Sequence, residues 1–342
     1  MEFRVLGINS GIGVSLHPFK WNLIGNMEQR GIFHTKKDEQ WKANFKAPLW
    51  KNYEDCKNWL SNEKIKPNII ISSPDCGSGS ILRLSRAKSL GDHNKNVSLQ
   101  TFILSVRELK PRFFLFENLD GLFKSVPEEK LDKIFKKYHL VKHIVSVSKF
   151  GNSQVSRKRL VIVGIKKKAN IPIEQCREIF SLSPIPPYLK TCGQLYGDLP
   201  DSMDSKIAHI RELPGTMVTM YSRFKLTVAE IQHVWQMEFT GKKRWVVKDR
   251  KFSCAPGVYR NLSTDYPATA RKANRQFDHN GQMLTPRQLA RIQGVPDSFK
   301  ICCEPPNYGY WINKGRAAVT KTPPYEISVW FKQCLESHYF KD

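Results

Sequence analysis

Short apolar runs alternate along the chain with longer segments that carry hydrophobic residues at helical spacing. The runs lie at residues 3–8, 21–28, 67–71, 113–116, 143–147 and 160–164. Their length and their β-branched or aromatic residues are typical of buried strands. We expect helices before Pro67, over about 97–109, from Pro127 onward and over about 325–336. This alternation predicts an α/β domain.

The most informative stretch follows the run at 67–71. It reads Ser72-Ser73-Pro74-Asp75-Cys76-Gly77-Ser78-Gly79-Ser80, which puts one thiol at the carboxyl end of a predicted parallel strand. Open α/β sheets keep their chemistry at that end. Cys76 is therefore a candidate nucleophile, although a lone cysteine beside a turn is more often a small buried hydrophobic residue.

Two features near the N-terminus favour a cofactor that contains a nucleoside. Asn9-Ser10-Gly11-Ile12-Gly13 follows the first run, and its two glycines let the backbone turn tightly and approach a ligand, with a helix able to follow. Glu28 ends the second run, where a carboxylate can accept hydrogen bonds from both ribose hydroxyls. The alternatives are an ordinary turn and a solvated surface glutamate.

Charged residues also flank two later runs. Glu117 ends the run at 113–116, where burial of a carboxylate is unfavourable unless the group is paired or protonated. Arg157 and Arg159 lead into the run at 160–164, and their spacing points both guanidinium groups to one face. Planar, permanently charged groups suit a phosphate or a base edge. Solvated strand ends are the alternative.

The charge narrows the class of partner. Lys and Arg number 55 and Asp and Glu 31, a net charge of +24, which favours a nucleic acid or an acidic membrane surface. Basic residues that suit contacts with DNA gather in a loop and in a later run with an embedded tryptophan, unless these are solvated surface segments. They are Arg83, Arg86 and Lys88 in the loop and Lys242, Lys243 and Arg244 in the run.

The cysteines and the apolar runs limit the setting. The eight cysteines form no CxxC pair and no metal-ligand spacing, so we expect no metal. A disulfide framework is not expected in so long a chain, which indicates reduced thiols and a cytoplasmic protein. No apolar run is long enough to span a bilayer, and no signal-like segment begins the chain. We expect a soluble monomer.

The motifs, in their order, resemble those of the DNA cytosine carbon-5 methyltransferase family. They are Gly11-Ile12-Gly13, Glu28, Pro74-Asp75-Cys76, Glu117-Asn118-Leu119, Arg157-Lys158-Arg159, the segment 266–270, the segment 284–299 and Gly315-Arg316-Ala317-Ala318-Val319. The resemblance implies a Rossmann-like α/β sheet with helices on both faces and a smaller target-recognition domain. It implies a catalytic, cofactor-binding domain at 1–165, target recognition at 166–263 and a return to the first domain at 264–342.

The resemblance further implies S-adenosyl-L-methionine as cofactor and double-stranded DNA as partner. Cys76 would add to carbon 6 of a cytosine flipped out of the duplex, and protonated Glu117 would hold the ring nitrogen. Arg157 and Arg159 would hold the base and its phosphate while the loop 77–96 closes. The implied cofactor residues are Asn9, Ser10, Gly11, Ile12, Gly13, Glu28, Pro74, Arg316 and Ala318.

The chain departs from the family pattern at several positions. Asp75 replaces a proline beside the nucleophile, where a carboxylate should raise the pKa of the thiol and slow its attack. Asn9 replaces an aromatic residue that covers the adenine, and one extra residue follows Gln154. Arg316 replaces an asparagine close to the transferred methyl group, where a cation beside a sulfonium is unfavourable.

Arg316 leaves open which group is transferred. A guanidinium suits carboxy-S-adenosyl-L-methionine, whose transferred group bears a carboxylate, and the product would be 5-carboxymethylcytosine. Otherwise Arg316 faces DNA phosphate or solvent, or the motif is aligned differently. An RNA cytosine methyltransferase is a further alternative. So is a DNA-binding homologue without catalysis, which Asp75 and the altered cofactor motifs favour.

Overall fold

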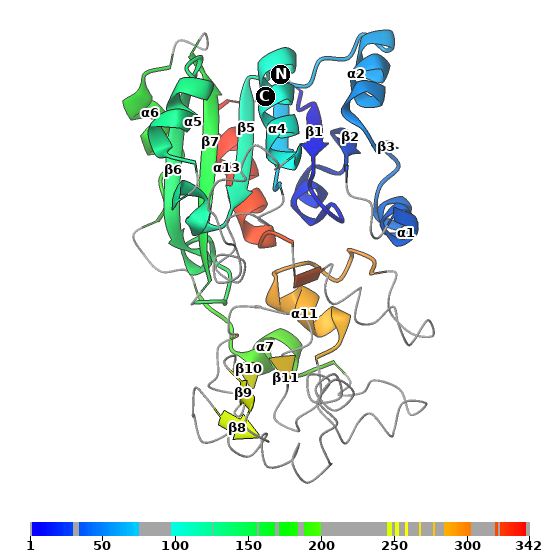
Figure 1. Cartoon of the computed structure of the whole chain (residues 1–342), viewed down its shortest axis with the longest axis vertical. Helices are drawn as coiled ribbons and strands as arrows, with labels where there is room; N and C mark the ends of the chain where they lie inside the picture. The colour runs from blue at the N-terminus through cyan, green and yellow to red at the C-terminus, as the bar shows by residue number, and fades with distance from the viewer. Residues whose placement is uncertain are drawn as a thin grey trace.

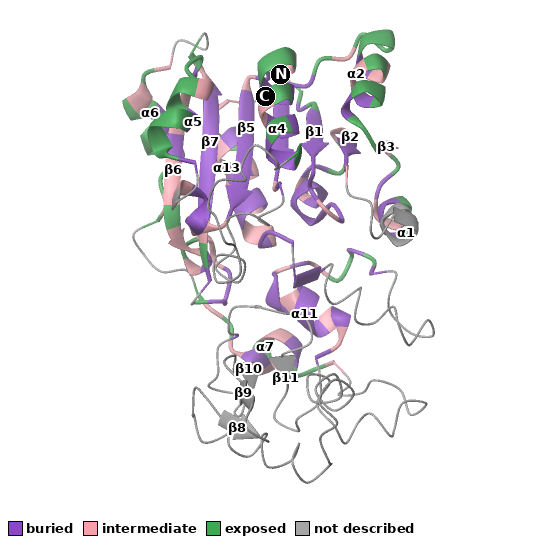
Figure 2. Ribbon diagram, viewed as in Figure 1, coloured by how far each residue is buried: buried purple, intermediate pink, exposed green. Residues whose placement is uncertain are grey.

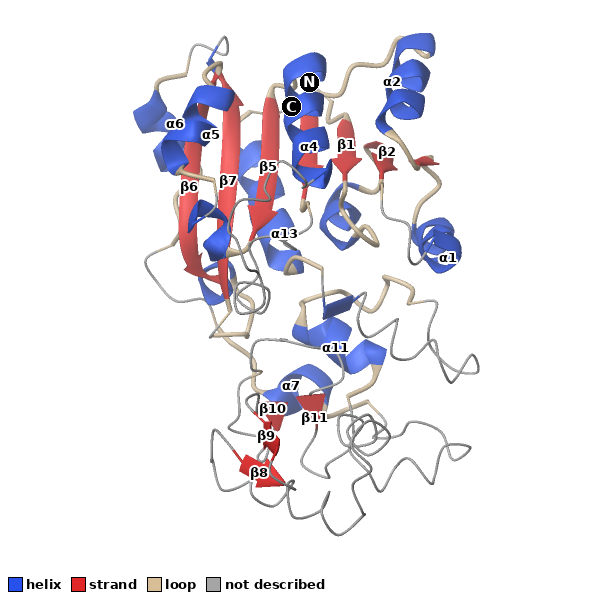
Figure 3. Ribbon diagram, in the orientation of Figure 1, coloured by secondary structure: helices blue, strands red, loops and turns tan. Residues whose placement is uncertain are grey.

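One seven-stranded sheet, with helices packed on both faces, forms the body of the protein (Figures 1 and 3). The computed structural model describes residues 2–29, 34–74, 97–124, 126–155, 157–167, 171–183, 188–199, 245–247, 250–252, 257–258, 267, 276–277, 284–301, 319–320 and 322–339. The α/β architecture predicted from the alternating runs is confirmed.

The sheet has the strand order β3-β2-β1-β4-β5-β7-β6. Its strands are β1 (Val5–Ile8), β2 (Leu23–Met27), β3 (Leu49–Trp50), β4 (Ile69–Ser72), β5 (Phe113–Asn118), β6 (Tyr138–Ser146) and β7 (Lys158–Lys166). The first five run parallel, whereas β7 is antiparallel to both β5 and β6. All six predicted runs became strands, and β4 is parallel to its neighbours as predicted.

The helices are α1 (His34–Asn44), α2 (Tyr53–Asn62), α4 (Val97–Leu109), α5 (Glu128–Ile134), α6 (Ile173–Ile179), α7 (Cys192–Tyr196), α11 (Pro286–Ile292) and α13 (Tyr325–His338). Four of the helices, α2, α4, α5 and α13, fall close to the positions predicted from the sequence, whereas α1, α6, α7 and α11 were not predicted. Shorter elements are the 3₁₀ helices η1 (Val14–Phe19), η3 (Asp120–Lys124) and η4 (Val147–Phe150) and the strands β8 (Trp245–Val247), β9 (Arg250–Phe252), β10 (Gly257–Val258) and β11 (Gln276–Phe277).

The sheet is buried because successive side chains of each strand enter a different hydrophobic layer (Figure 2). Along β5, Phe113 and Leu115 join the cluster that contains η1 and α13. Phe114 and Phe116 join the opposite cluster, which contains α2, α4 and α5. Apolar side chains on both faces explain why the strands appear in the sequence as continuous apolar runs.

The segment after the first strand differs from the simplest expectation of an α-helix. Gly13 adopts φ +89°, and the chain then forms the 3₁₀ helix η1, which contains Pro18. Proline lacks a backbone N–H and clashes with the carbonyl four residues earlier, so a short 3₁₀ helix replaces an α-helix here.

A second group of elements lies beyond the carboxyl ends of the parallel strands (Figure 1). In it α7 packs against α11, although the two are far apart in the sequence. The expected domain boundary at residue 166 stays a prediction, and α6, which follows it, packs against β6 of the main sheet. Among the described residues, no helix has both the length and the apolar character needed to cross a membrane.

Gly164 tests the packing of the sheet. It pairs with Phe114 across β5 and β7, and an added Cβ would lie 2.0 Å from the Phe114 ring. We expect Gly164→Ala to lower the free energy of unfolding by about 1–3 kcal/mol in urea titrations. Adding Phe114→Leu to this variant should recover part of the loss, because it removes the clashing ring. A loss that stays additive in the double variant would contradict this account.

Candidate active site

The candidate acid Glu117 lies at the end of β5, next to the end of β4. The strands pair in parallel, with Ser72 opposite Phe116. Continuing this register by one residue puts Ser73 next to Glu117. The Ser73 hydroxyl donates a hydrogen bond to Oε2 of Glu117 over 2.5 Å. The sequence signal for this contact is the polar pair Ser72-Ser73, whose second member the sequence analysis gave no role.

Glu117 receives its second partner from β7. The Arg159 Nε lies 2.9 Å from Oε1 of Glu117, and both side chains are largely buried, 13% and 8% exposed. Glu117 is paired with Val161 across the two strands, so Arg159 is its diagonal neighbour on the same face. The expectation that a carboxylate at this strand end needs a partner is met by a cation on one oxygen and a hydroxyl on the other.

Asn118 holds the start of the loop that leads to Cys76. Its Nδ2 donates to the carbonyl oxygen of Pro74 over 3.0 Å, and its Oδ1 accepts from the backbone N–H of Leu119. Residues 117 and 118 thus bond to residues 73 and 74 in turn. The last described residue before Cys76 is therefore fixed to the end of β5.

The predicted cofactor turn and Glu28 are brought together at the ends of β1 and β2. Glu28, 6% exposed, accepts a hydrogen bond at Oε2 from the backbone N–H of Gly11 over 2.7 Å. Gly11 has φ +66°. Ser10 and Ile12 are buried, and the Ser10 hydroxyl donates to the carbonyl oxygen of Ile71 on β4.

Asn9 is a buried connector at this edge. Its Oδ1 accepts from the backbone N–H of Gln29 over 3.1 Å, and its Nδ2 donates to the carbonyl oxygen of Ser98 over 3.2 Å. It adopts φ +54°, a left-handed conformation that asparagine tolerates better than most residues. Asn9 thus joins the end of β2 to the first turn of α4.

These residues fit a cofactor that contains a ribose. A Cβ placed on Gly11 would meet no atom within 4 Å, whereas one on Gly13 would lie 2.6 Å from the Phe45 ring. The chain is therefore packed behind Gly13 and open above Gly11. A buried carboxylate beside an open glycine turn can accept hydrogen bonds from ribose hydroxyls, as predicted for Glu28.

Arg157 and Arg159 have different partners. Arg157 is 1% exposed. Its Nη2 donates to the carbonyl oxygen of Thr322 over 2.9 Å, and its Nη1 donates to Oε1 of Gln293. Arg157 thus ties β7 to the segments around α11 and α13, while Arg159 alone pairs with Glu117. A contact between Arg157 and a base or phosphate stays a prediction.

Glu326 completes the buried polar cluster around Arg157. Its Oε2 accepts from Nδ2 of Asn152 over 3.0 Å. Burial raises the pKa of Glu326 to about 7, against the opposing effects of the Asn152 hydrogen bond and of the charges on Arg157 and Lys190. Nothing in the sequence marks this residue, because Glu326 looks like an ordinary acidic residue in the first turn of a helix.

Several predicted site residues lie outside the described residues. They are Cys76, Arg83, Arg86, Lys88, Lys242, Lys243, Arg244, Arg316 and Ala318, together with Asp75. Their proposed roles therefore stay predictions. Pro74, the remaining predicted cofactor residue, is buried beside Asn118.

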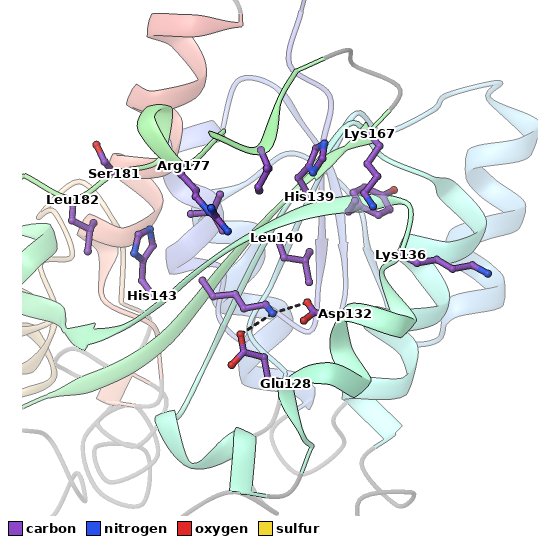
Figure 4. A pocket seen from close by; sticks show the side chains of 14 residues that line it. Glu128, Asp132, Lys136, His139, Leu140, His143, Lys167, Arg177, Ser181 and Leu182 are labelled. Carbon is purple, nitrogen blue, oxygen red and sulfur yellow. Dashed lines mark hydrogen bonds and ion pairs between the residues drawn. The ribbon is translucent and has the colours of Figure 1, made fainter. Parts of the chain in front are cut away.

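A separate groove of about 860 Å³ crosses the edge strand β6 between α5 and α6 (Figure 4). Lys142 is one of its lining residues, and its ammonium donates to both Glu128 and Asp132. The groove contains none of the predicted site residues. The predicted site residues that the structure describes lie instead at the ends of β1, β2, β4 and β5 and at the start of β7.

Comparison with known proteins identifies one family. The model of C-5 cytosine-specific DNA methylases matches residues 3–307. The chain is 25% identical to the Type II methyltransferase M.FnuDI of Fusobacterium nucleatum over 288 residues. The aligned region covers 77% of this chain and 76% of that protein. The chain is 21% identical over 291 residues to the Type II methyltransferase M.Bsp6I of a Bacillus species, which covers 80% and 83%.

Solved structures share the fold. A DNMT2 mutant from Spodoptera frugiperda superposes with a TM-score of 0.65 at 14% identity, over 98% of this chain and 99% of that chain. The methyltransferase EhMeth of Entamoeba histolytica also gives 0.65, at 11% identity over 100% of both chains. At such low identities the likeness concerns the fold alone.

The raised pKa of Glu326 predicts a pH dependence of stability. In the folded protein the Glu326 carboxyl group keeps its proton up to about pH 7, whereas the ordinary pKa of a glutamate is 4.5. Between these values the folded state binds more protons than the unfolded state, so the free energy of unfolding falls as pH rises, by up to about 3 kcal/mol. Glu326→Gln should remove this fall in urea titrations at pH 5, 6, 7 and 8.

Glu336→Gln is the matched control, because Glu336 lies on the same helix with its side chain 47% exposed. If Glu326→Gln and Glu336→Gln keep the same pH dependence as the wild type, Glu326 does not carry the effect.

Proposed function

Because the chain belongs to the C-5 cytosine-specific DNA methylase family, we propose that it transfers a methyl group to carbon 5 of cytosine in double-stranded DNA through a covalent bond to Cys76. The chain is a methyltransferase enzyme. The observation that carries the finer proposal is the placement of Glu117. It stands at the end of β5, held by Ser73 and Arg159, and Ser73 lies three residues before Cys76 in the sequence.

Cys76 is the proposed nucleophile. Its thiolate adds to carbon 6 of a cytosine turned out of the duplex, and the electrons of the 5,6 double bond become available at carbon 5. Carbon 5 then takes the methyl group. Water then takes the proton from carbon 5, and the electrons of that C–H bond restore the double bond and expel the thiolate. S-adenosyl-L-methionine, when bound, supplies the methyl group as a substituent of its sulfonium.

Glu117 and Arg159 act on the base in this proposal. A neutral Glu117 donates a hydrogen bond to the ring nitrogen and thereby offsets the charge that develops during addition. Arg159 fixes the orientation of Glu117 through Oε1. The Glu117 residue is only 6% exposed, so water competes little for its hydrogen bonds. The carboxyl group can therefore act as a proton donor with a fixed direction.

The cofactor lies in this proposal at the ends of β1 and β2. Glu28 accepts hydrogen bonds from the ribose, and the open turn at Gly11 lets the backbone approach the ligand. Asn9 supports this edge through its bonds to Gln29 and Ser98. These residues suit the ribose, whatever group is attached to the sulfur. Their fit therefore supports a cofactor of the S-adenosyl-L-methionine type.

The remaining parts of the proposal concern DNA. We place target recognition in residues 166–263, between the catalytic segments 1–165 and 264–342. The basic residues Lys242, Lys243 and Arg244 contact the DNA, and Arg83, Arg86 and Lys88 close over the flipped base. The net charge of +24 supports a polyanionic partner.

The first test is covalent trapping on duplex DNA that contains 5-fluorocytosine. Because carbon 5 of this base carries fluorine in place of hydrogen, there is no proton to remove, and the bond to the enzyme persists. The wild type should form an adduct in the presence of cofactor, and Cys76→Ser should form none while still binding DNA. Cys334→Ser is the matched control, because burial raises the pKa of the Cys334 thiol to about 11 and makes it a poor nucleophile at neutral pH. Adduct formation by Cys76→Ser would reject the proposed nucleophile.

Mass spectrometry of nucleosides from cells that express the protein identifies the transferred group. We expect 5-methylcytosine in DNA. The carboxymethyl alternative, which rests on Arg316, requires 5-carboxymethylcytosine that changes to 5-methylcytosine in Arg316→Asn. Modified cytosine in RNA alone would favour the RNA alternative. If the protein binds DNA but neither DNA nor RNA contains modified cytosine, the result would favour a homologue without catalysis.

Glu28→Gln tests the cofactor site without turnover. The glutamine carbonyl can still accept from Gly11, but the charge-assisted hydrogen bonds to ribose are lost. We expect the dissociation constant of S-adenosyl-L-methionine in isothermal titration calorimetry to rise about tenfold, with little change in melting temperature. Equal binding by the variant and the wild type would place the ribose elsewhere.

A further inference from the structure

The Ser73 hydroxyl makes the shorter of the two side-chain contacts described above for Glu117. Its Oγ lies 2.5 Å from Oε2, shorter than the 2.9 Å between Arg159 Nε and Oε1. Ser73 precedes Pro74, whose carbonyl oxygen is held by Asn118. The serine backbone is therefore fixed on both sides, by β4 before it and by this hydrogen bond after it.

The chemistry of the two partners of Glu117 differs. A guanidinium only donates hydrogen bonds, so Arg159 requires Oε1 to accept in every protonation state. When Glu117 is neutral, its proton therefore lies on Oε2, the oxygen that faces Ser73. The Ser73 hydroxyl donates to Oε2 when Glu117 is ionised, and it can still donate to a lone pair of Oε2 when that oxygen carries the proton, which leaves the acid O–H free to point away from Ser73. Ser73 thus remains a suitable partner for Oε2 before and after Glu117 takes up a proton.

We propose that Ser73 is a positioning residue that holds Oε2 of Glu117 in both protonation states and so directs the acid proton toward the flipped cytosine. This inference rests on the proposed function, because it assumes that Glu117 serves a base activated by Cys76. Ser73 itself makes no bond to the reacting atoms. It limits rotation of the Glu117 carboxyl group, which Arg159 alone holds at one oxygen.

Ser72 provides a contrast within the same strand. Its side chain is 1% exposed, and its hydroxyl donates to the carbonyl oxygen of Ile8 on β1 over 2.6 Å. This hydrogen bond joins two strands and does not reach Glu117. Ser72 and Ser73 are thus adjacent serines with short hydrogen bonds, of which only the second contacts the candidate acid.

The experiment compares Ser73→Ala, Ser73→Thr and Ser72→Ala with the wild type. The readouts are the rate of adduct formation on 5-fluorocytosine DNA, the affinity for that DNA, the affinity for S-adenosyl-L-methionine and the melting temperature. We expect Ser73→Ala to slow adduct formation about 10- to 100-fold, as for loss of a hydrogen bond to a charged group, with both affinities within about twofold of the wild type.

Ser73→Thr should restore at least a third of the wild-type rate, because threonine keeps the hydroxyl. Ser72→Ala should lower the melting temperature while slowing adduct formation less than about threefold, because its hydrogen bond is structural. Such a split between rate and stability is not expected if Ser73 only supports the fold.

Three results would overturn the inference. They are a wild-type rate in Ser73→Ala, a threonine variant as slow as the alanine variant, and equal slowing in Ser72→Ala and Ser73→Ala. Failure of the proposed function gives a different result, because the wild type itself would then form no adduct. An active wild type with an unaffected Ser73→Ala rejects the role of Ser73 alone.

Discussion

The structure of the site depends on the burial of one carboxylate at the end of an apolar strand. Phe113, Phe114, Leu115 and Phe116 precede Glu117, and all five residues are buried. A carboxylate in this place is unfavourable unless donors reach both of its oxygens. One donor comes from the residue after β4 and the other from β7. The strand order is what makes this possible, because β5 lies between β4 and the antiparallel β7.

A second buried charge joins the end of the chain to the same sheet. Arg157 lies two residues before Arg159, yet it bonds to Gln293 and to the carbonyl oxygen of Thr322. Removing a hydrogen-bond partner of a buried charge is strongly destabilising because the charge is left without compensation. The effect of Arg157 is to specify position. It fixes segments more than 130 residues away in the sequence against the start of β7, which carries Arg159.

The sequence was sufficient for the elements but not for the partners of the polar residues. The six apolar runs and the helix at 97–109 were predictable because buried strands and amphipathic helices have distinct periods. The strand–turn pattern identified Glu28 and the turn at Gly11 as separate cofactor features, but not the hydrogen bond that joins them. By contrast, the direction of β7 and the separate roles of Arg157 and Arg159 depend on tertiary pairing. Ser73 was missed because serine beside a proline is common in loops, and Glu326 because its burial is set by α13 packing.

The departures from the family pattern have different weights once the contacts are known. Asn9 was an argument for lost cofactor binding, since an aromatic residue is expected there. In the structure Asn9 adopts a left-handed backbone conformation and both ends of its amide are bonded, so local structure accounts for its identity. The ion pair between Glu117 and Arg159, by contrast, favours an enzyme over a homologue without catalysis. Stability alone does not favour a largely buried ion pair over apolar side chains. A module that only binds DNA does not require such a pair, whereas a catalyst that must present one carboxyl oxygen in a fixed direction does, and the pair therefore argues for catalysis.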